Sequence, residues 1–198
     1  MVITYFGGGT YRLQSGETSL LVDPENNRLK ADVVLKTLAS ADFDPSGKEQ
    51  NGSTQLTASE ISFPGEYEVK GIEIFGLGAK DESGEKLLKT VYAVEWEEMK
   101  FVFLGHVSKP LPADIVEEIE EPDVLFLPVG GGHFLAPEVA AKIAKQLEPS
   151  LIFPTFYKSP ADFLKAMGQK VSAEEKFVFK KKDLANEKNK VVILETRS

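Results

Sequence analysis

The first half of the chain alternates short apolar runs with Gly, Pro and Asn, a pattern typical of β-strands joined by turns. The runs predicted as strands are 2–6, 10–14, 18–22, 32–36, 66–70, 71–77, 89–96 and 99–104. The last four form two pairs, separated by tight turns at Lys70-Gly71 and Glu97-Glu98. The pattern therefore predicts antiparallel pairing in this half.

The second half adds helices to the pattern. Apolar residues recur at helical spacing in 112–119 and 137–147, and a shorter helix is predicted before Gly168. The segment from Ser159 to Asp162 resembles a capping box for that third helix. Apolar runs that read as further strands are 124–127, 151–153, 177–179 and 191–194. The order of elements predicts packed layers of sheet with helices outside.

Composition narrows the class of protein. A length of 198 residues with 42% hydrophobic and 27% charged residues is ordinary for a globular domain, so we expect one domain over 1–198. No run reaches the roughly 18–20 apolar residues of a membrane-spanning helix, which predicts a soluble, cytoplasmic protein without membrane partners. The net charge of −8 disfavours nucleic acid. Because cysteine is absent, disulfides, thiolate zinc sites and cysteine nucleophiles are excluded.

Seven segments, taken in order, resemble the metallo-β-lactamase superfamily, and in particular its small single-domain branch of lactonase-like and uncharacterised Zn-dependent hydrolases. They are Ile3 to Gly7, Ser19 to Pro24, Ala31 to Thr37, Pro64 to Ile72, Phe103 to Gly105, Asp123 to Gly131 and Leu151 to Thr155. The resemblance implies an α/β fold, the four-layer αββα sandwich, with two mainly antiparallel sheets packed face to face and outer helices. It also implies an active site along one edge of the sandwich.

The same resemblance implies that the metal site is degenerate. The family places a Thr-His-x-His-x-Asp-His segment directly after the strand that corresponds to 31–36, and further ligands after two later strands. The positions corresponding to its ligands are Leu38, Ser40, Asp42, Phe43, His106 and Phe156. Leucine and phenylalanine offer no donor, and a hydrolytic zinc needs three protein ligands beside its water. We therefore expect no zinc and no other cofactor.

Several polar residues remain as weaker candidates. His106 follows an apolar strand, so it is either a general base, with Asp42 as its partner, or a structural histidine. Asp42, His106 and His133 form a possible residual metal set, although Asp42 also suits a turn or helix cap. His133 follows Gly130-Gly131-Gly132, which reads as an anion cradle or as a strand-to-helix turn. Tyr157 is a possible pocket residue beside Phe156.

Two functions follow from these residues. The first is a catalytically inactive pseudoenzyme that binds a small molecule or a protein partner and can form a homo-oligomer. The alternative is a metal-independent or single-metal hydrolase of esters or lactones that uses His106 and Asp42. Nucleic-acid processing, known among relatives of this fold, is disfavoured by the acidic balance.

Overall fold

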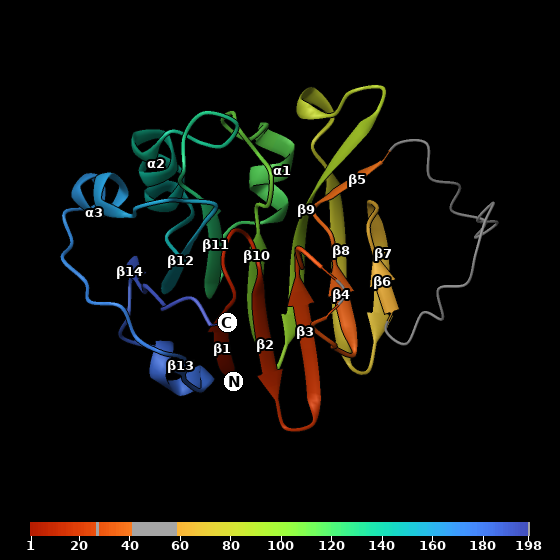
Figure 1. Ribbon diagram of the computed structural model, residues 1–198, viewed down its shortest axis with the longest axis horizontal. Coiled ribbons are helices and arrows are strands. Elements are labelled where there is room, and N and C mark those ends of the chain that lie inside the picture. The colour runs from red at the N-terminus through yellow and green to blue at the C-terminus, as the bar shows by residue number, and fades with distance from the viewer. Residues whose placement is uncertain (27, 41–58, 198) are drawn as a thin grey trace.

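Two β-sheets packed face to face form the body of the molecule, and α-helices cover one side of this sandwich (Figure 1). The computed structural model describes residues 1–26, 28–40 and 59–197. The candidates Asp42 and Phe43 lie outside these residues. The two-sheet sandwich predicted from the sequence is confirmed.

The smaller sheet has the strand order β13-β1-β2-β3-β4-β6. Its strands are β1 (Val2–Tyr5), β2 (Tyr11–Ser15), β3 (Thr18–Val22), β4 (Val33–Leu35), β6 (Ser59–Ile61) and β13 (Phe177–Val178). Pairing is antiparallel from β13 through β1 and β2 to β3, whereas β4 runs parallel to both β3 and β6. Because β3 and β4 are parallel, their carboxyl ends share one edge of the sheet.

The larger sheet has the order β14-β12-β11-β10-β9-β8-β7. Its strands are β7 (Gly65–Val69), β8 (Ile72–Gly78), β9 (Leu87–Trp96), β10 (Met99–Phe103), β11 (Val124–Pro128), β12 (Leu151–Thr155) and β14 (Lys190–Val191). The short strand β5 (Leu38–Ser40) pairs with β9. Strands β10, β11 and β12 are mutually parallel, so their carboxyl ends also share an edge.

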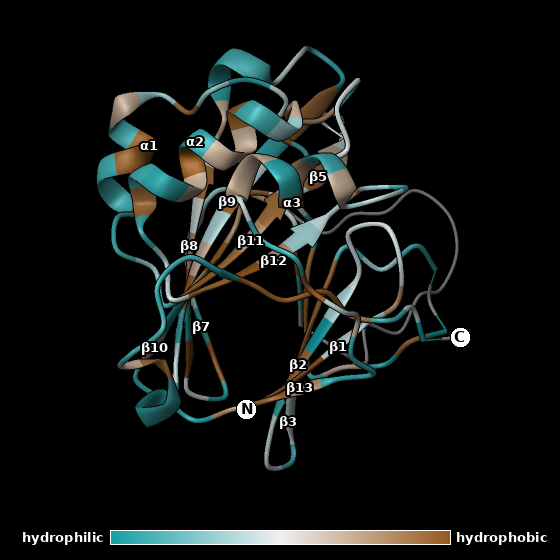
Figure 2. Cartoon of the chain, turned by 90° about the vertical axis from the view of Figure 1, so that its left-hand side faces the viewer, coloured by the Kyte–Doolittle hydropathy of each residue, from teal (hydrophilic) through white to brown (hydrophobic). Residues whose placement is uncertain are grey.

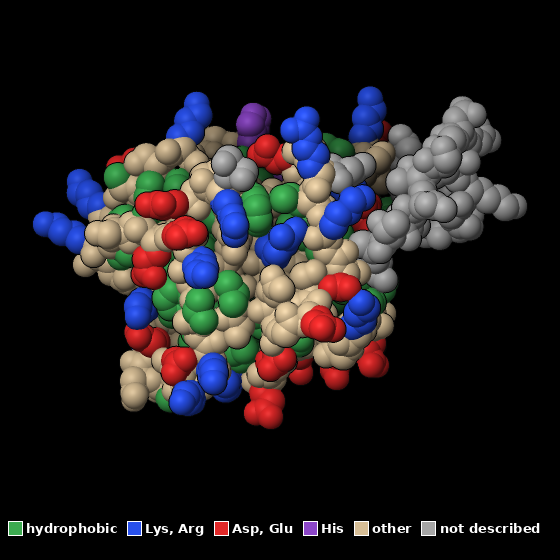
Figure 3. Space-filling view, turned by 60° about the horizontal axis from the view of Figure 1, so that its bottom comes forward, with side chains coloured by type: hydrophobic (Ala, Val, Ile, Leu, Met, Phe, Trp, Pro, Cys, Tyr) green, Lys and Arg blue, Asp and Glu red, His purple; other side chains and the backbone are tan. Residues whose placement is uncertain are grey.

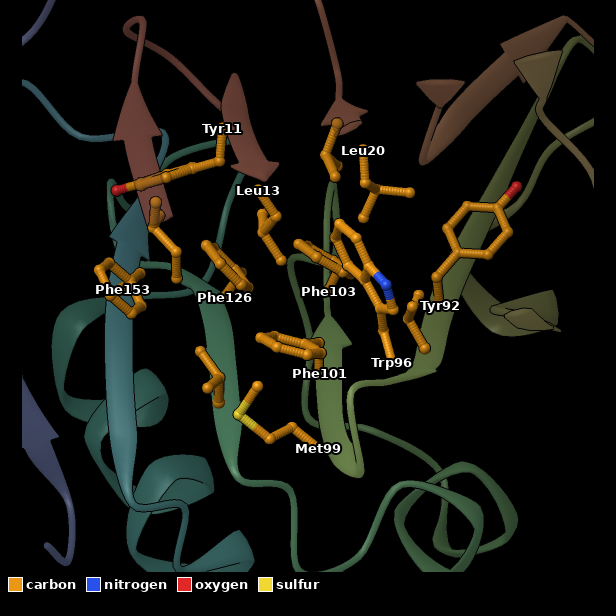
Figure 4. Packing of buried hydrophobic residues seen from close by; sticks show 14 of the residues in the cluster. Tyr11, Leu13, Leu20, Tyr92, Trp96, Met99, Phe101, Phe103, Phe126 and Phe153 are labelled. Carbon is orange, nitrogen blue, oxygen red and sulfur yellow. The ribbon is translucent and has the colours of Figure 1, made fainter. Parts of the chain in front are cut away.

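The inner core lies between the sheets and is rich in aromatic side chains. Figure 4 shows Tyr11 and Leu13 of the smaller sheet facing Phe103 and Phe126 of the larger one. The Phe103 and Phe126 rings stack with centroids 4.4 Å apart. This geometry adds to the apolar burial that stabilises both sheets. The apolar side chains of the alternating strands therefore face the space between the sheets, as predicted.

The helices cover the outer face of the larger sheet, as Figure 2 shows for all three of them. They are α1 (Ala113–Glu118), α2 (Pro137–Leu147) and α3 (Ala161–Met167), and two 3-10 turns lie at Lys80–Glu82 and Lys181–Leu184. The described part of the chain thus shows a helix–sheet–sheet arrangement. None of its helices is long and apolar enough to cross a membrane.

The predicted hairpin turns are present, whereas the predicted cap of the third helix is not. Lys70, Glu97 and Glu98 have positive φ angles, as two-residue hairpin turns require. The predicted capping box at Ser159 is wrong, because α3 begins after Pro160 and no side chain caps it. The Ser159 hydroxyl instead accepts a hydrogen bond from the Ala161 N–H at 3.3 Å. Because Pro160 occupies the N-cap position, Ser159 lies one residue too early to cap the helix.

Candidate functional site

Five segments meet at the edge of the sandwich where parallel strands end. They follow β3, β4, β10, β11 and β12, and they carry Asp23, Thr37, His106, Phe134 and Phe156. In sheets of this kind, groups placed after the carboxyl ends of parallel strands converge on one site. The convergence explains how residues far apart in the sequence come into contact here.

A hydrogen-bonded chain of three side chains forms the polar part of the site. The Thr37 hydroxyl lies 2.6 Å from Asp23 Oδ2 and 2.7 Å from His106 Nδ1. The Thr37 backbone N–H also donates to Asp23 Oδ1 at 2.7 Å. The Asp23 carboxyl and the His106 ring are 3.9 Å apart, so the hydroxyl bridges them. Thr37 is fully buried, and its role is to connect the other two groups.

Backbone geometry fixes this chain in place. Gly105 has a φ of +59°, and a Cβ on it would come within 2.2 Å of the Thr37 side chain. Only glycine therefore lets the strand that presents His106 approach Thr37 so closely. On the other side, the Thr10 hydroxyl donates to the Asp23 carbonyl at 2.6 Å. The positions of the carboxylate and the imidazole are thus determined by neighbouring strands.

Burial moves the two titratable groups toward their neutral forms. It raises the pKa of Asp23 from 3.8 to about 6, although hydrogen bonds from Thr37 and the charge of Lys36 oppose the shift. Burial, assisted by the positive charge of Lys89, lowers the pKa of His106 to about 4. At neutral pH the aspartate is therefore ionised and the imidazole is neutral.

The ionised carboxylate determines the histidine tautomer. A carboxylate only accepts hydrogen bonds, so the single Thr37 hydroxyl proton is donated to Asp23. The hydroxyl oxygen must then accept from His106, which places the ring proton on Nδ1. Nε2 of His106 is left without a proton, as an acceptor or base.

Aromatic rings form the rest of the site. The Phe156 ring lies 4.5 Å from the His106 ring and stacks on Phe134 at 4.4 Å, with an interplanar angle of 10°. The Phe156 N–H donates to the Gly8 carbonyl at 2.7 Å, and Phe156 has a positive φ of 54°. A Cβ on Gly9 would come within 2.1 Å of this ring. We call Phe134 and Phe156 the aromatic plug.

The remaining sequence candidates lie at different places in the fold. Leu38 and Ser40 belong to β5, where they pair with Lys89 and Leu87 of β9. His133 is exposed on the loop after β11, in which Gly131 and Gly132 have positive φ angles. Tyr157 is partly buried, and its ring stacks on that of Tyr5 with centroids 6.1 Å apart. The structure therefore brings together His106 and Phe156 of the predicted set, while His133 stays on the surface.

Sequence reasoning missed Asp23, Thr37 and Phe134 as site residues. In the sequence, Asp23 and Thr37 belong to two of the segments that resemble the family, and neither was predicted as a site residue. A signal did exist, since Asp23 comes directly after β3 and Thr37 comes two residues after β4, at the edge where the site lies. Phe134 carried no local signal, because its partner Phe156 follows a different strand.

The donor set that the described residues supply does not fit a hydrolytic zinc ion. Such an ion takes three nitrogen, sulfur or carboxylate ligands from the protein. Across 1–26, 28–40 and 59–197, no three His, Cys, Asp or Glu side chains lie close enough together to hold a metal. Within the described part of the chain, the site offers one imidazole and one carboxylate, both hydrogen-bonded to Thr37, and the Phe156 ring lies against the imidazole.

The fold and the edge site define the class as a metallo-β-lactamase-type sandwich, and comparison with known proteins identifies the family. The model of the β-lactamase superfamily domain matches residues 2–156, so the chain belongs to this family. The predicted superfamily is thereby confirmed.

Several similar proteins carry names of metal-dependent enzymes. The chain is 24% identical to a UPF0173 metal-dependent hydrolase of Methanopyrus kandleri, over 79% of this chain and 84% of that protein. It is 22% identical to another from Natranaerobius thermophilus, over 88% and 94%. A solved Thermotoga maritima structure, assigned as a Zn-dependent hydrolase of the metallo-β-lactamase superfamily, aligns with a TM-score of 0.75 at 27% identity and 98% coverage of both chains.

Proposed function

We propose that this chain is a zinc-free member of its family that acts as a binding and interaction module. The observation that carries the proposal is the Phe156 ring, which packs on His106 and Phe134 at a position where the family has a histidine ligand. Strands from β1 to β14 contribute to one sandwich, which supports a single domain over 1–198.

The chemistry of the plug also supports loss of zinc. A vacated metal cavity lined by polar groups would leave them unsatisfied, at about 1–3 kcal/mol for each buried group. Here the aromatic rings occupy the site, and Thr37 satisfies Asp23 and one nitrogen of His106. The pocket is thus stable without a cation.

We predict that protein purified without chelator contains zinc far below one equivalent per chain. Because the described site has two ionisable donors, added zinc should not raise the melting temperature. Metal analysis by mass spectrometry and a thermal melt with and without zinc measure both quantities. The protein should also leave ester and lactone substrates intact. Near-stoichiometric zinc together with hydrolysis of either substrate would overturn the proposal.

A second candidate function is metal-independent hydrolysis of an ester or lactone by His106. It is favoured by the unprotonated Nε2, which could take a proton from a water molecule as that water attacks the carbonyl, and could then return the proton to the leaving alkoxide. Asp23, through Thr37, would position the ring. A pKa of about 4 makes His106 a weak base at neutral pH, so this candidate ranks second.

The His106→Ala substitution separates the two candidates. If the chain is a hydrolase of this kind, the substitution should lower kcat by roughly two to four orders of magnitude, and a chelator should have no effect on the parent protein. His133→Ala is the matched control, because that histidine is exposed on the loop after β11. Hydrolysis that survives His106→Ala would exclude the second candidate.

A further inference from the structure

A groove runs along the outer face of the larger sheet, away from the aromatic plug. Its wider part, about 420 Å³, is lined by residues that include Glu73, Glu95, Glu97 and Glu98. A smaller lobe of about 160 Å³ adjoins it at Glu95 and Lys100. The groove thus spans the hairpin β8–β9 and the start of β10.

The small lobe combines three apolar residues with the charged residues Glu95, Lys100 and Glu118. Phe75, Leu77 and Ala93 line it, and they belong to the outward faces of β8 and β9. Phe75 and Leu77 are only partly buried. Their exposed surface is available to an apolar side chain of a partner, which would gain about 0.8 kcal/mol for each methylene group buried.

Glutamates form a row across three strands beside this lobe. Glu68 of β7 is directly opposite Glu73 of β8, and Glu73 is directly opposite Glu95 of β9. Like charges in such positions destabilise a sheet. None of the three forms an ion pair with another described residue. Figure 3 shows acidic side chains along its lower right edge, the side on which Figure 1 places β7 to β9.

Two lysines, Lys100 and Lys181, also line the groove beside this row. Lys100 lies directly opposite Glu95, and its Nζ donates to the backbone carbonyls of Glu118 and Glu120, at 3.1 and 2.9 Å. Lys181 is paired with Asp123 at 2.7 Å. Carboxylates therefore outnumber ammonium groups in the wider part of the groove, which makes its potential negative. The carboxylates are those of Glu73, Glu95, Glu97, Glu98 and Asp123.

We propose that this groove binds a basic, amphipathic segment of another protein, with an apolar side chain in the lobe and Lys or Arg side chains along the glutamate row. The inference rests on the proposed function, since it gives the interaction module its surface and the chemistry of its partner. Charge complementarity selects a cationic partner and repels nucleic acid and anionic membrane. The partly exposed Phe75 and Leu77 select a partner with an apolar anchor.

The test measures binding of a fluorescein-labelled peptide of alternating lysine and leucine by fluorescence anisotropy. Binding should weaken as salt rises. The double variant Glu73→Gln/Glu95→Gln should bind roughly tenfold more weakly, since each lost exposed ion pair is worth up to about 1 kcal/mol. Its melting temperature should stay equal or rise, because repulsion across the sheet is removed. The matched control Glu17→Gln/Glu138→Gln removes the same charge elsewhere and should bind like the parent.

The contribution of the apolar residues in the small lobe to peptide binding is measured separately. Leu77→Ser should weaken binding of the lysine–leucine peptide several-fold. Leu87→Ser should leave binding unchanged, because Leu87 lies outside the groove and is 49% exposed. A peptide of alternating lysine and serine should bind weakly to every form. Equal binding of both peptides, or equal effects of the groove and control variants, would overturn the proposal in favour of unspecific attraction of cations.

Two further outcomes would also overturn it. If the parent chain dimerises in sedimentation experiments and the groove variants do not, the occupant is a second copy. If no peptide binds at low salt, the groove is not a docking site. These results are independent of the zinc measurement, so the groove can fail while the zinc-free proposal stands, and the reverse also holds.

Discussion

Replacing Gly130 by alanine is expected to destabilise the protein by about 3 kcal/mol, because a Cβ there would lie 1.9 Å from the Phe156 carbonyl oxygen. The clash involves backbone on both sides, so a rotamer change cannot relieve it. For a chain of this size, the melting temperature should fall by about 6–12 °C. Thermal and urea denaturation measure the loss. Gly84→Ala is the control, since nothing lies within 4 Å of the position that its methyl group would take and its φ is not positive.

A glycine-to-alanine substitution at Gly9 tests the packing of the aromatic plug. In the parent protein, Gly9→Ala should be destabilising, because the Phe156 ring would have to leave His106 and Phe134. In a Phe156→Ala background the space is open, so Gly9→Ala should cost much less. The double-mutant cycle therefore gives a coupling free energy of about 1–3 kcal/mol. Independent effects of the two substitutions would show that the ring does not pack against Gly9.

The sequence predicted the elements well where local chemistry decides. Helix α2 has the predicted bounds, since its apolar stripe, Pro137 and the residues around Pro149 act locally. The two hairpins follow from strand alternation and turn length. The short strands β5 and β6 were not predicted, because three residues carry no measurable periodicity and their pairing partners are distant in sequence.

The sequence predicted where the site lies in the fold, but not which side chains contact one another there. The resemblance led to His106 and Phe156, and both lie there. The partner of His106 was expected to be Asp42, whereas the described contact runs through Thr37 to Asp23. This pairing depends on the close approach that Gly105 permits between β4 and β10, which belong to different sheets. Tertiary geometry of this kind leaves no periodic signal in the sequence.

The Asp23–Thr37–His106 chain leads to a prediction about pH. A folded pKa of about 6 for Asp23, raised from 3.8, contributes stability that is complete below pH 3.8 and is lost as pH rises through 6. A folded pKa of about 4 for His106, lowered from 6.5, contributes stability that is complete above pH 6.5 and is lost as pH falls through 4. Between pH 4 and 6, the two contributions change in opposite directions and largely cancel.

Single isosteric substitutions should therefore reveal how the stability contributed by each group depends on pH. Asp23→Asn keeps an acceptor and a donor for Thr37 but removes the titration, so its stability relative to the parent should increase as pH rises from about 4 to about 6. His106→Gln leaves Asp23 to titrate alone, and its relative stability should decrease over the same range. Each slope approaches about 1.4 kcal/mol per pH unit, so the two variants should diverge by up to about 5 kcal/mol across the window.

Urea denaturation of the parent and both variants, at several values across this window, measures the divergence. Comparison with the parent removes the contribution of the other carboxylates, which all three proteins share. Asp23→Ala should be the most destabilised variant at every pH, because the Thr37 N–H and hydroxyl both lose their acceptor. Parallel pH profiles for Asp23→Asn and His106→Gln would mean that burial does not shift the pKa values of the carboxylate and the imidazole in opposite directions. The same result would remove the physical basis for a site that is stable without a cation.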